Sequence, residues 1–231
     1  MPKRTLVLAA LVALFAAGCG GDKKDEKKAA TTATTETTAA PEKDAAGCDV
    51  VEAPEPRGPG TEKKPTLKLS ASKTYVVTLD TNCGEIQITL DVKRAPKTSA
   101  SFASLVDKGF YDGLTFHRVL ADFVIQGGDP LGNGQGGPGY NVVEKAPSDL
   151  QYKRGIVAMA KAGVDPSGAS GSQFFIVTAE DAGLPPQYAL VGKVKGSFGA
   201  IEKIIAEPVD GPNGVPLNPV VIESASIDPK P

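Results

Sequence analysis

Phe116-His117-Arg118-Val119-Leu120-Ala121-Asp122-Phe123-Val124-Ile125-Gln126-Gly127-Gly128-Asp129 is the stretch that decides how this chain folds. From Leu114 to Val119 the side chains alternate with the two-residue period of a β-strand. Strict alternation would place Phe116 and Arg118 on one face of the strand and His117 on the other. The pattern therefore predicts a short strand that carries a permanent cation.

A second β-rich run follows at residues 123–125, and Gly127-Gly128 ends it. Two short strands around a bend would bring together a guanidinium, an aromatic ring and an amide, from Arg118, Phe123 and Gln126. No nucleophile with an obvious base accompanies them, and no cluster of metal ligands does. The chemistry expected here is therefore non-covalent.

Four blocks of sequence resemble the signature of the cyclophilins, which are peptidyl-prolyl cis-trans isomerases. The blocks keep the order and approximate spacing of that family from about Thr74 to Asp228. They are Phe116-His117-Arg118 with Phe123 and Gln126-Gly127-Gly128-Asp129, then Gly155–Ala160, Gly171–Ile176, and Leu184 with Gly192-Lys193-Val194. The resemblance implies an isomerase domain over residues 73–229.

The fold expected is mainly β, with many short strands separated by turns and two helices. Pro96 suits the first turn of a helix that Gly109 would end, and a second helix is expected over residues 198–206. The resemblance implies a closed eight-stranded antiparallel β-barrel capped by these two α-helices. Strands are expected at residues 74–80, 85–90, 114–119, 123–125, 155–160, 173–178, 189–194 and 220–227.

The resemblance also assigns roles to residues of a groove on the outside of the barrel. It gives Arg118, Phe123 and Gln126 the catalytic positions, with the guanidinium near the proline nitrogen of a twisted amide. The other residues expected to bind substrate are Ala160 and Lys161 through their backbones, Gln173, Phe175, Leu184 and Tyr188. For the arginine the alternative is a surface salt bridge, and for the phenylalanines it is the barrel core.

Rotation about an X–Pro bond needs no cofactor, because no bond is broken. The barrier of about 18–20 kcal/mol comes from amide resonance. Only an interaction stronger in the twisted state than in the planar one accelerates rotation. A fixed donor such as Arg118 meets that requirement. His117 is expected to be a packed, hydrogen-bonded side chain rather than a general base.

Composition excludes several other functions. The net charge is −2 and no block of basic residues occurs, so nucleic acid is not an expected partner. The chain has a single histidine, whereas a zinc site needs several His or Cys ligands, so no metal is expected. The run from Gly132 to Gly137 fits the spacing G-x-G-x-x-G, but Pro138-Gly139 follows it instead of a helix, so it is not a dinucleotide site.

The first residues have the pattern of an export signal. Lys3-Arg4 precede an apolar run from Leu6 to Ala17 that is too short to span a membrane. Ala16-Ala17-Gly18-Cys19 resembles a bacterial lipobox, which implies a signal peptide over residues 1–19 and a lipid on Cys19. An ordinary signal peptide cut nearby is the alternative. The chain is thus expected to be exported and anchored to a bacterial membrane.

Residues 20–72 are expected to form a disordered linker, because charged, Ala/Thr-rich and Pro-rich tracts bury little apolar surface. Cys48 and Cys83 remain after the anchor. In an exported protein two such cysteines often pair, and the alternative is two reduced thiols.

Two functions from different classes remain. The first is a monomeric isomerase acting on proline-containing polypeptides among exported proteins. The second is a proline-peptide-binding chaperone module with little turnover, since the same groove must bind before it catalyses.

Overall fold

The computed structural model describes residues 42–231. The expected signal peptide, Cys19 and residues 20–41 of the expected linker lie outside the described residues. Within residues 42–231, no helix is long and apolar enough to cross a membrane.

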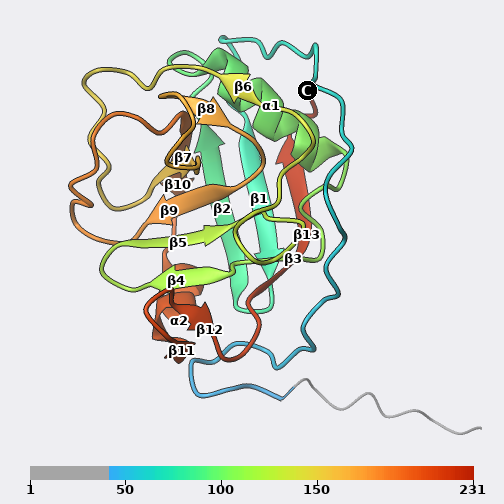
Figure 1. Cartoon of the computed structure of the whole chain (residues 1–231), viewed down its shortest axis with the longest axis vertical. Helices are drawn as coiled ribbons and strands as arrows, with labels where there is room; N and C mark the ends of the chain where they lie inside the picture. The colour runs from blue at the N-terminus through green and yellow to red at the C-terminus, as the bar shows by residue number, and fades with distance from the viewer. Residues whose placement is uncertain (1–41) are drawn as a thin grey trace, which may run out of the picture. The chain divides into compact units, whose positions relative to one another are not determined.

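Nine strands form one sheet in which every pairing is antiparallel (Figure 1). Their order across the sheet is β3-β13-β1-β2-β10-β7-β9-β5-β4. Their bounds are Val76–Thr81 (β1), Gly84–Leu90 (β2), Leu114–Thr115 (β3), Arg118–Leu120 (β4), Val124–Gly127 (β5), Ile156–Met159 (β7), Phe174–Val177 (β9), Leu190–Lys195 (β10) and Val221–Asp228 (β13). Two short hairpins complete the β structure: Val142–Val143 (β6) with Ala169–Ser170 (β8), and Val209–Asp210 (β11) with Val215–Pro216 (β12).

The two ends of the sheet are adjacent in the sequence. β3 is at one end of the strand order and β4 at the other, yet only Phe116 and His117 separate them. The sheet must therefore curl back on itself, and a register shift between Asp80 and Thr81 adds local twist. When β3 and β4 are counted as one interrupted strand, the sheet has the eight strands that the sequence predicts.

That interruption corrects the expected strand over residues 114–119. Phe116 is buried in the core with Val119, whereas Arg118 is half-exposed, so Phe116 and Arg118 do not share a face. The reason is that Phe116 and His117 leave the ladder between the two strands, and the two-residue period does not carry across the break.

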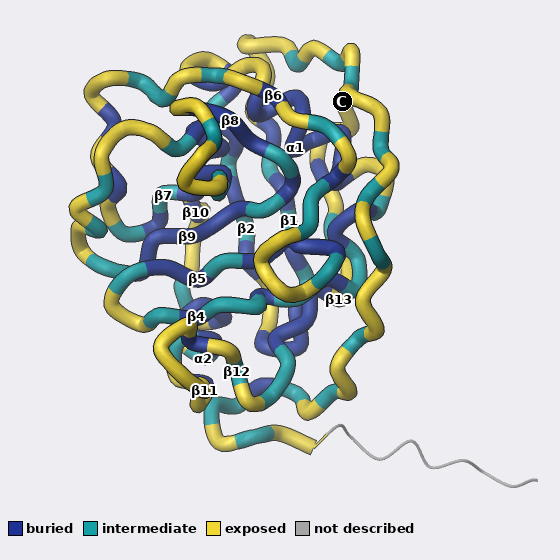
Figure 2. Tube along the Cα trace, in the orientation of Figure 1, coloured by how far each residue is buried: buried dark blue, intermediate teal, exposed yellow. Residues whose placement is uncertain are grey.

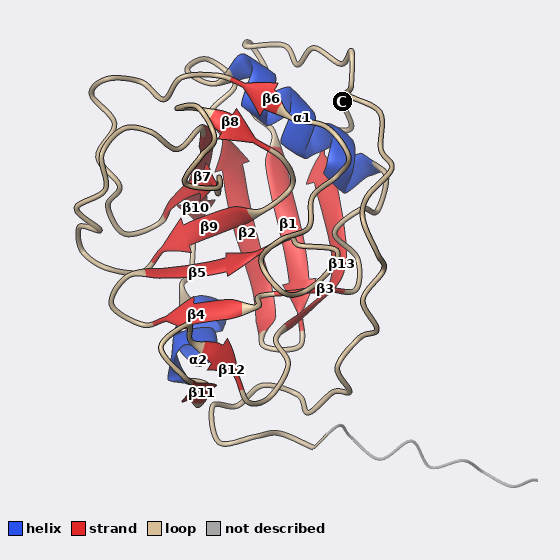
Figure 3. Ribbon diagram, in the orientation of Figure 1, coloured by secondary structure: helices blue, strands red, loops and turns tan. Residues whose placement is uncertain are grey.

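Two helices cover the sheet at opposite ends of the view in Figure 3. α1 runs from Pro96 to Asp107 and packs against β13 and β10, and α2 runs from Gly199 to Ala206 and packs against β2. Both agree with the expected helices. Gly109 follows the first with φ = 66°, a left-handed conformation that glycine adopts without strain.

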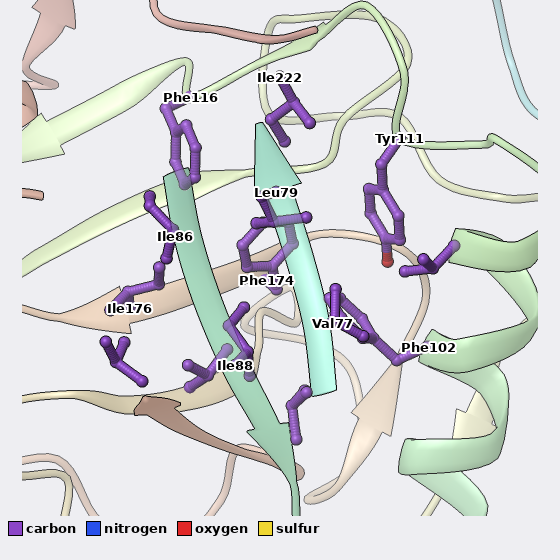
Figure 4. Close-up of a cluster of buried hydrophobic side chains, with 14 of the residues drawn as sticks. Val77, Leu79, Ile86, Ile88, Phe102, Tyr111, Phe116, Phe174, Ile176 and Ile222 are labelled. Atoms are coloured by element: carbon purple, nitrogen blue, oxygen red, sulfur yellow. The ribbon is translucent and has the colours of Figure 1, made fainter. Parts of the chain in front are cut away.

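A core of large apolar side chains fills the inner side of the curled sheet (Figure 4). Phe174 is its centre, since its ring meets those of Phe102, Tyr111 and Phe116 edge-on or nearly so, at centroid distances of 5.4, 5.6 and 5.7 Å. Figure 2 shows the same distribution, with buried residues following the strands and exposed ones following the loops.

A second, smaller apolar cluster lies on the outer side of the sheet. Strand β9 contributes to both, because alternation turns Phe174 inward and Phe175 outward. The outer cluster also contains Val124, Tyr152 and Leu190, and the partly buried Phe123, Leu184 and Tyr188 pack on it.

Residues 42–72, named here the N-terminal arm, were expected to belong to a disordered linker, and the structure corrects that prediction. The arm lies along the outside of the domain (Figure 1). A disulfide joins its Cys48 to Cys83 with an S–S distance of 2.00 Å, and Leu67 and Leu69 pack against the inner core. Composition alone predicts disorder for this segment, because the disulfide and the packing of Leu67 and Leu69 join it to residues that a reading of the segment by itself does not include.

An acid pair lies where the arm meets the end of α2. The side-chain amide of Asn218 donates to Asp44 at 3.4 Å and to Glu207 at 3.3 Å. Burial and the neighbouring Asp44 raise the pKa of Glu207 to about 7. Burial works to raise the pKa of Asp44 as well, but hydrogen bonds from Glu207 and three backbone N–H groups outweigh it and lower that pKa. Of the two carboxyl groups, Glu207 is therefore the one that takes up a proton first as the pH falls.

Candidate active site

The hairpin of β4 and β5 positions the residues that the sequence places together. Arg118 and Gln126 are directly opposed in the antiparallel register, and the guanidinium Nη1 donates to Gln126 Oε1 at 3.5 Å. Phe123 lies at the turn between the strands, with its ring centroid 5.8 Å from the guanidinium carbon. Among residues 42–231, no carboxylate forms an ion pair with Arg118, which argues against the surface salt bridge.

The neighbouring strand β9 adds the apolar wall. Phe175 is the register partner of Gln126, and the Tyr188 ring stands edge-on to Phe175 at 5.4 Å. Tyr152 holds Tyr188 in place, since its hydroxyl donates to the carbonyl of Tyr188 at 2.6 Å and accepts from its N–H at 3.0 Å. Sequence reasoning gave Tyr152 no role, because nothing local links residues so far apart.

Together these residues line a hollow of about 140 Å³, named here the proline pocket. Eight of the nine predicted site residues line it, and so does Val124. The full lining is Arg118, Phe123, Val124, Gln126, Ala160, Lys161, Phe175, Leu184 and Tyr188.

Gln173, the remaining predicted residue, lines a second hollow of about 390 Å³, named here the middle hollow. Gln126, Ala160 and Lys161 line both, so the two hollows are neighbours along the surface. Gln126 Nε2 donates to Gln173 Oε1 at 3.0 Å, and Gln173 Nε2 donates to the carbonyl of Gly136 at 2.8 Å. A chain of amides thus connects Arg118 to the loop of residues 129–139, named here the glycine loop.

Asp129 stiffens the glycine loop. Its side chain is almost fully buried, and its carboxylate accepts hydrogen bonds from the N–H groups of Leu131, Asn133 and Gly134 at 2.8, 3.0 and 2.6 Å. An aspartate at the start of a glycine-rich loop is the local signal for such a turn, although the sequence analysis did not use it. The loop leads into β6 and not into a helix.

The backbone expected to meet a peptide is only partly free. The N–H of Ala160 donates to the carbonyl of Gln173 at 2.8 Å, so the backbone group that Ala160 can offer to a peptide is its carbonyl. The Lys161 ammonium bonds the carbonyls of Ala162 and Asp165, each at 3.2 Å, and lies 5.8 Å from the Tyr188 ring. Lys161 therefore places a tethered charge at the edge of the groove.

His117 lines neither hollow. Both of its ring nitrogens are buried, and neither has a hydrogen-bond partner among residues 42–231, so the expected hydrogen bond is absent there. Burial lowers the pKa of His117, with Asp129 opposing this and Arg118 adding to it. The imidazole is accordingly neutral at neutral pH.

In the described part of the chain, one set of side chains has the spacing of metal ligands. It comprises Cys48, Cys83 and Glu207, whose ligand atoms lie within 4.8 Å of one another. The two sulfur atoms are bonded to each other, so neither provides a thiolate.

Comparison with known proteins places this geometry in a family. The family model described as cyclophilin type peptidyl-prolyl cis-trans isomerase/CLD matches residues 76–227. Peptidyl-prolyl cis-trans isomerase A of Mycobacterium tuberculosis is 41% identical over 172 residues, covering 67% of this chain and 92% of that protein. Peptidyl-prolyl cis-trans isomerase B of Streptomyces anulatus is 39% identical over 169 residues, covering 65% of this chain and 95% of that protein.

Solved structures agree. The crystal structure of a Cryptosporidium parvum cyclophilin type peptidyl-prolyl cis-trans isomerase matches with a TM-score of 0.63 and 31% identity, covering 69% of this chain and all of that one. A second structure of that protein, in the presence of the dipeptide Ala-Pro, matches with a TM-score of 0.61 and 32% identity, covering 66% of this chain and 98% of that one.

The chain belongs to the cyclophilin-type peptidyl-prolyl cis-trans isomerases. Its activity is the acceleration of rotation about X–Pro bonds, and the mainly β fold with two helices is that of the family.

Proposed function

We propose that Arg118 is the residue of this chain that stabilises the twisted X–Pro amide. As the C–N bond rotates, the proline nitrogen loses its resonance and becomes more basic. A guanidinium is always charged, and its planar array of donors is held here by Gln126 and Phe123. Because this donor is fixed before the substrate arrives, its bond to the nitrogen strengthens only as the amide twists.

The proline pocket supplies the ground-state binding of a proline-containing polypeptide. Phe123, Phe175 and Leu184 form an apolar wall on which the proline ring packs, and Tyr188 closes one side. Burying such a ring contributes roughly 1.5–3 kcal/mol. The single observation that carries this assignment is that an arginine without an ion pair, among the described residues, faces an apolar hollow in which Gln126 also lies.

Replacing Arg118 by alanine tests the assignment. We expect kcat/KM for a proline peptide to fall by about 10²–10³, the loss typical for removing one preorganised donor. Peptide affinity should change far less, and the melting temperature should stay within a few degrees. The measurement is a coupled isomerisation assay together with equilibrium binding of the same peptide.

Arg94→Ala is the matched control, because Arg94 is a surface arginine that pairs with Asp149 and lines neither the proline pocket nor the middle hollow. It should leave the rate unchanged. Equal rates for wild type and Arg118→Ala would instead favour the chaperone module, which binds without turnover.

We propose further that the enzyme works outside the cytoplasm, on exported proteins whose folding is limited by slow proline isomerisation. The support is the signal-like start, the lipobox-like Ala16-Ala17-Gly18-Cys19 and a cysteine pair of the kind that oxidising compartments maintain. Mass spectrometry of the mature chain tests this. A lipid-modified Cys19 at the new N-terminus is the expected result, and an unprocessed Met1 would contradict it.

A further inference from the structure

A short part of the N-terminal arm, residues 57–62, is bound along the glycine loop and is named here the strap. The N–H of Arg57 donates to the carbonyl of Pro130 at 2.9 Å. Farther along, the N–H groups of Gly60 and Glu62 donate to the carbonyls of Gly137 and Pro138 at 3.0 and 2.8 Å. Backbone bonds at both ends therefore fix the strap against the loop.

Side chains fasten the strap on its other side. The Arg57 guanidinium donates to the carbonyl of Phe110 and lies 5.7 Å from the centroid of its ring. Glu62 forms an ion pair with Lys108 at 2.6 Å. The strap is thus attached both to the residues that follow α1 and to the loop beside the groove.

Glycines permit the close approach of strap and loop. A Cβ on Gly60 would lie 2.4 Å from the carbonyl oxygen of Gly137 and 2.7 Å from Cα of Pro138, closer than atoms can pack. A Cβ on Gly139, where φ is 96°, would lie 2.6 Å from the carbonyl oxygen of Gly60. Any larger residue at position 60 must push the strap away from the loop.

Between strap and loop lies a third hollow of about 330 Å³, named here the outer hollow. Pro59 and Gly60 form one side of it, and the glycine loop with Tyr140 and Asn141 forms the rest. Gln135 and Asn141 line the middle hollow as well. The proline pocket, the middle hollow and the outer hollow therefore follow one another along the surface, each sharing lining residues with the next.

We propose that the strap builds an additional subsite of the substrate groove, which binds the part of an extended polypeptide beyond the residues that flank the proline. This inference rests on the proposed location of the active groove. The strap lies outside residues 76–227 that match the family, so the subsite is a feature added by the arm of this chain.

The lining indicates which polypeptides fit. The outer hollow contains no charged side chain: it presents the amides of Gln135 and Asn141, glycine backbone, and the apolar surfaces of Leu131 and Tyr140. Amides and exposed backbone hydrogen-bond to a peptide main chain, whereas a charged residue would lose hydration there without gaining a partner. The subsite therefore takes uncharged, extended segments with little selection of sequence.

The test compares a short and a long substrate with the full-length chain in detergent. The short substrate has about four residues around the proline. Each of two long substrates has about ten residues, with uncharged residues added before the proline in one and after it in the other. A peptide of that length spans the three hollows when it is extended. Wild type should bind one long substrate with a KM about fivefold below that of the short one. Gly60→Val should abolish that advantage while leaving kcat and KM for the short substrate unchanged.

Arg57→Ala is a second variant that loosens the strap without a steric clash, and it should give the same result in weaker form. Thr61→Ala is the matched control, because Thr61 is an exposed strap residue, and it should behave as wild type. Circular dichroism and thermal unfolding verify that each variant is folded.

Two results would overturn the inference. One is an equal loss on short and long substrates, which would make the strap only a support for the glycine loop. The other is a long-substrate KM that no strap variant alters. Failure of the proposed active site is distinguishable, because it would appear as an Arg118→Ala rate equal to that of wild type on the short substrate.

Discussion

Phe174 and Phe175 are neighbours on one strand, yet they belong to two different regions of the molecule. Both are buried, at 0% and 4% exposure. Phe174 is enclosed by other rings of the inner core, whereas Phe175 belongs to a thin outer cluster with the open proline pocket on its far side. The exposed fraction of a side chain therefore does not distinguish a structural residue from a functional one. What distinguishes them is whether the side chain contacts only other core residues or also lines a pocket.

The largest effect should come from breaking the inner region. Phe174→Ala removes the ring that Phe102, Tyr111 and Phe116 surround, and should lower the free energy of unfolding by about 3–5 kcal/mol, the usual cost of such a cavity. Urea unfolding measures this. The kcat of the fraction that remains folded should match wild type, and a selective loss of kcat would contradict the division between the two regions.

The matching change on the outer side should act on binding first. Phe175→Ala removes one wall of the proline pocket and should raise KM about tenfold, since a tenfold change corresponds to roughly 1.4 kcal/mol of lost contact. Steady-state kinetics with a proline peptide measures it. Val177→Ala is the control, because Val177 belongs to the same strand and cluster but does not line the pocket. Equal effects of the two variants on KM would remove the distinction.

The smallest effect concerns pH: the stability of the fold should depend on pH, whereas the isomerase activity should not. The pKa of Glu207 is about 7 in the folded chain, above the ordinary value of 4.5. Because the pKa of Glu207 is higher in the folded chain than in the unfolded one, protonated Glu207 stabilises the folded state. This stabilisation is fully present below pH 4.5 and is lost as the pH rises toward 7. We therefore expect the free energy of unfolding to decline across that window, measured by urea unfolding at several pH values.

Glu207→Gln should flatten this decline, while Glu223→Gln, at an exposed glutamate, should not. The lowered pKa of Asp44 acts only at lower pH and does not overlap the window. Isomerase activity should stay level from pH 6 to 8, because His117 lines neither the proline pocket nor the middle hollow. A bell-shaped activity profile in this range would argue for a histidine acting as a general base.

Local chemistry explains the parts of the fold that the sequence predicts well. Pro96 and Gly109 mark the ends of α1 because proline lacks an N–H and glycine tolerates positive φ, and both properties are independent of the rest of the chain. The hairpin of β1 and β2 is equally local. Arg118, Phe123 and Gln126 were found together because a single turn joins them.

The errors share one physical cause, which is contact between residues far apart in sequence. The period of residues 114–119 could not reveal that β3 and β4 pair with different partners at the two ends of the sheet. The composition of residues 42–72 could not reveal the glycine loop that binds the strap.

The disulfide between Cys48 and Cys83 has a consequence for the chain once it meets proteases. The two cysteines are 35 positions apart, and the whole strap lies between them. A single cut of the backbone within that interval leaves both pieces covalently joined. A nicked molecule would still migrate as one species until a reductant is added, and its catalytic domain would stay attached to whatever holds its N-terminal end.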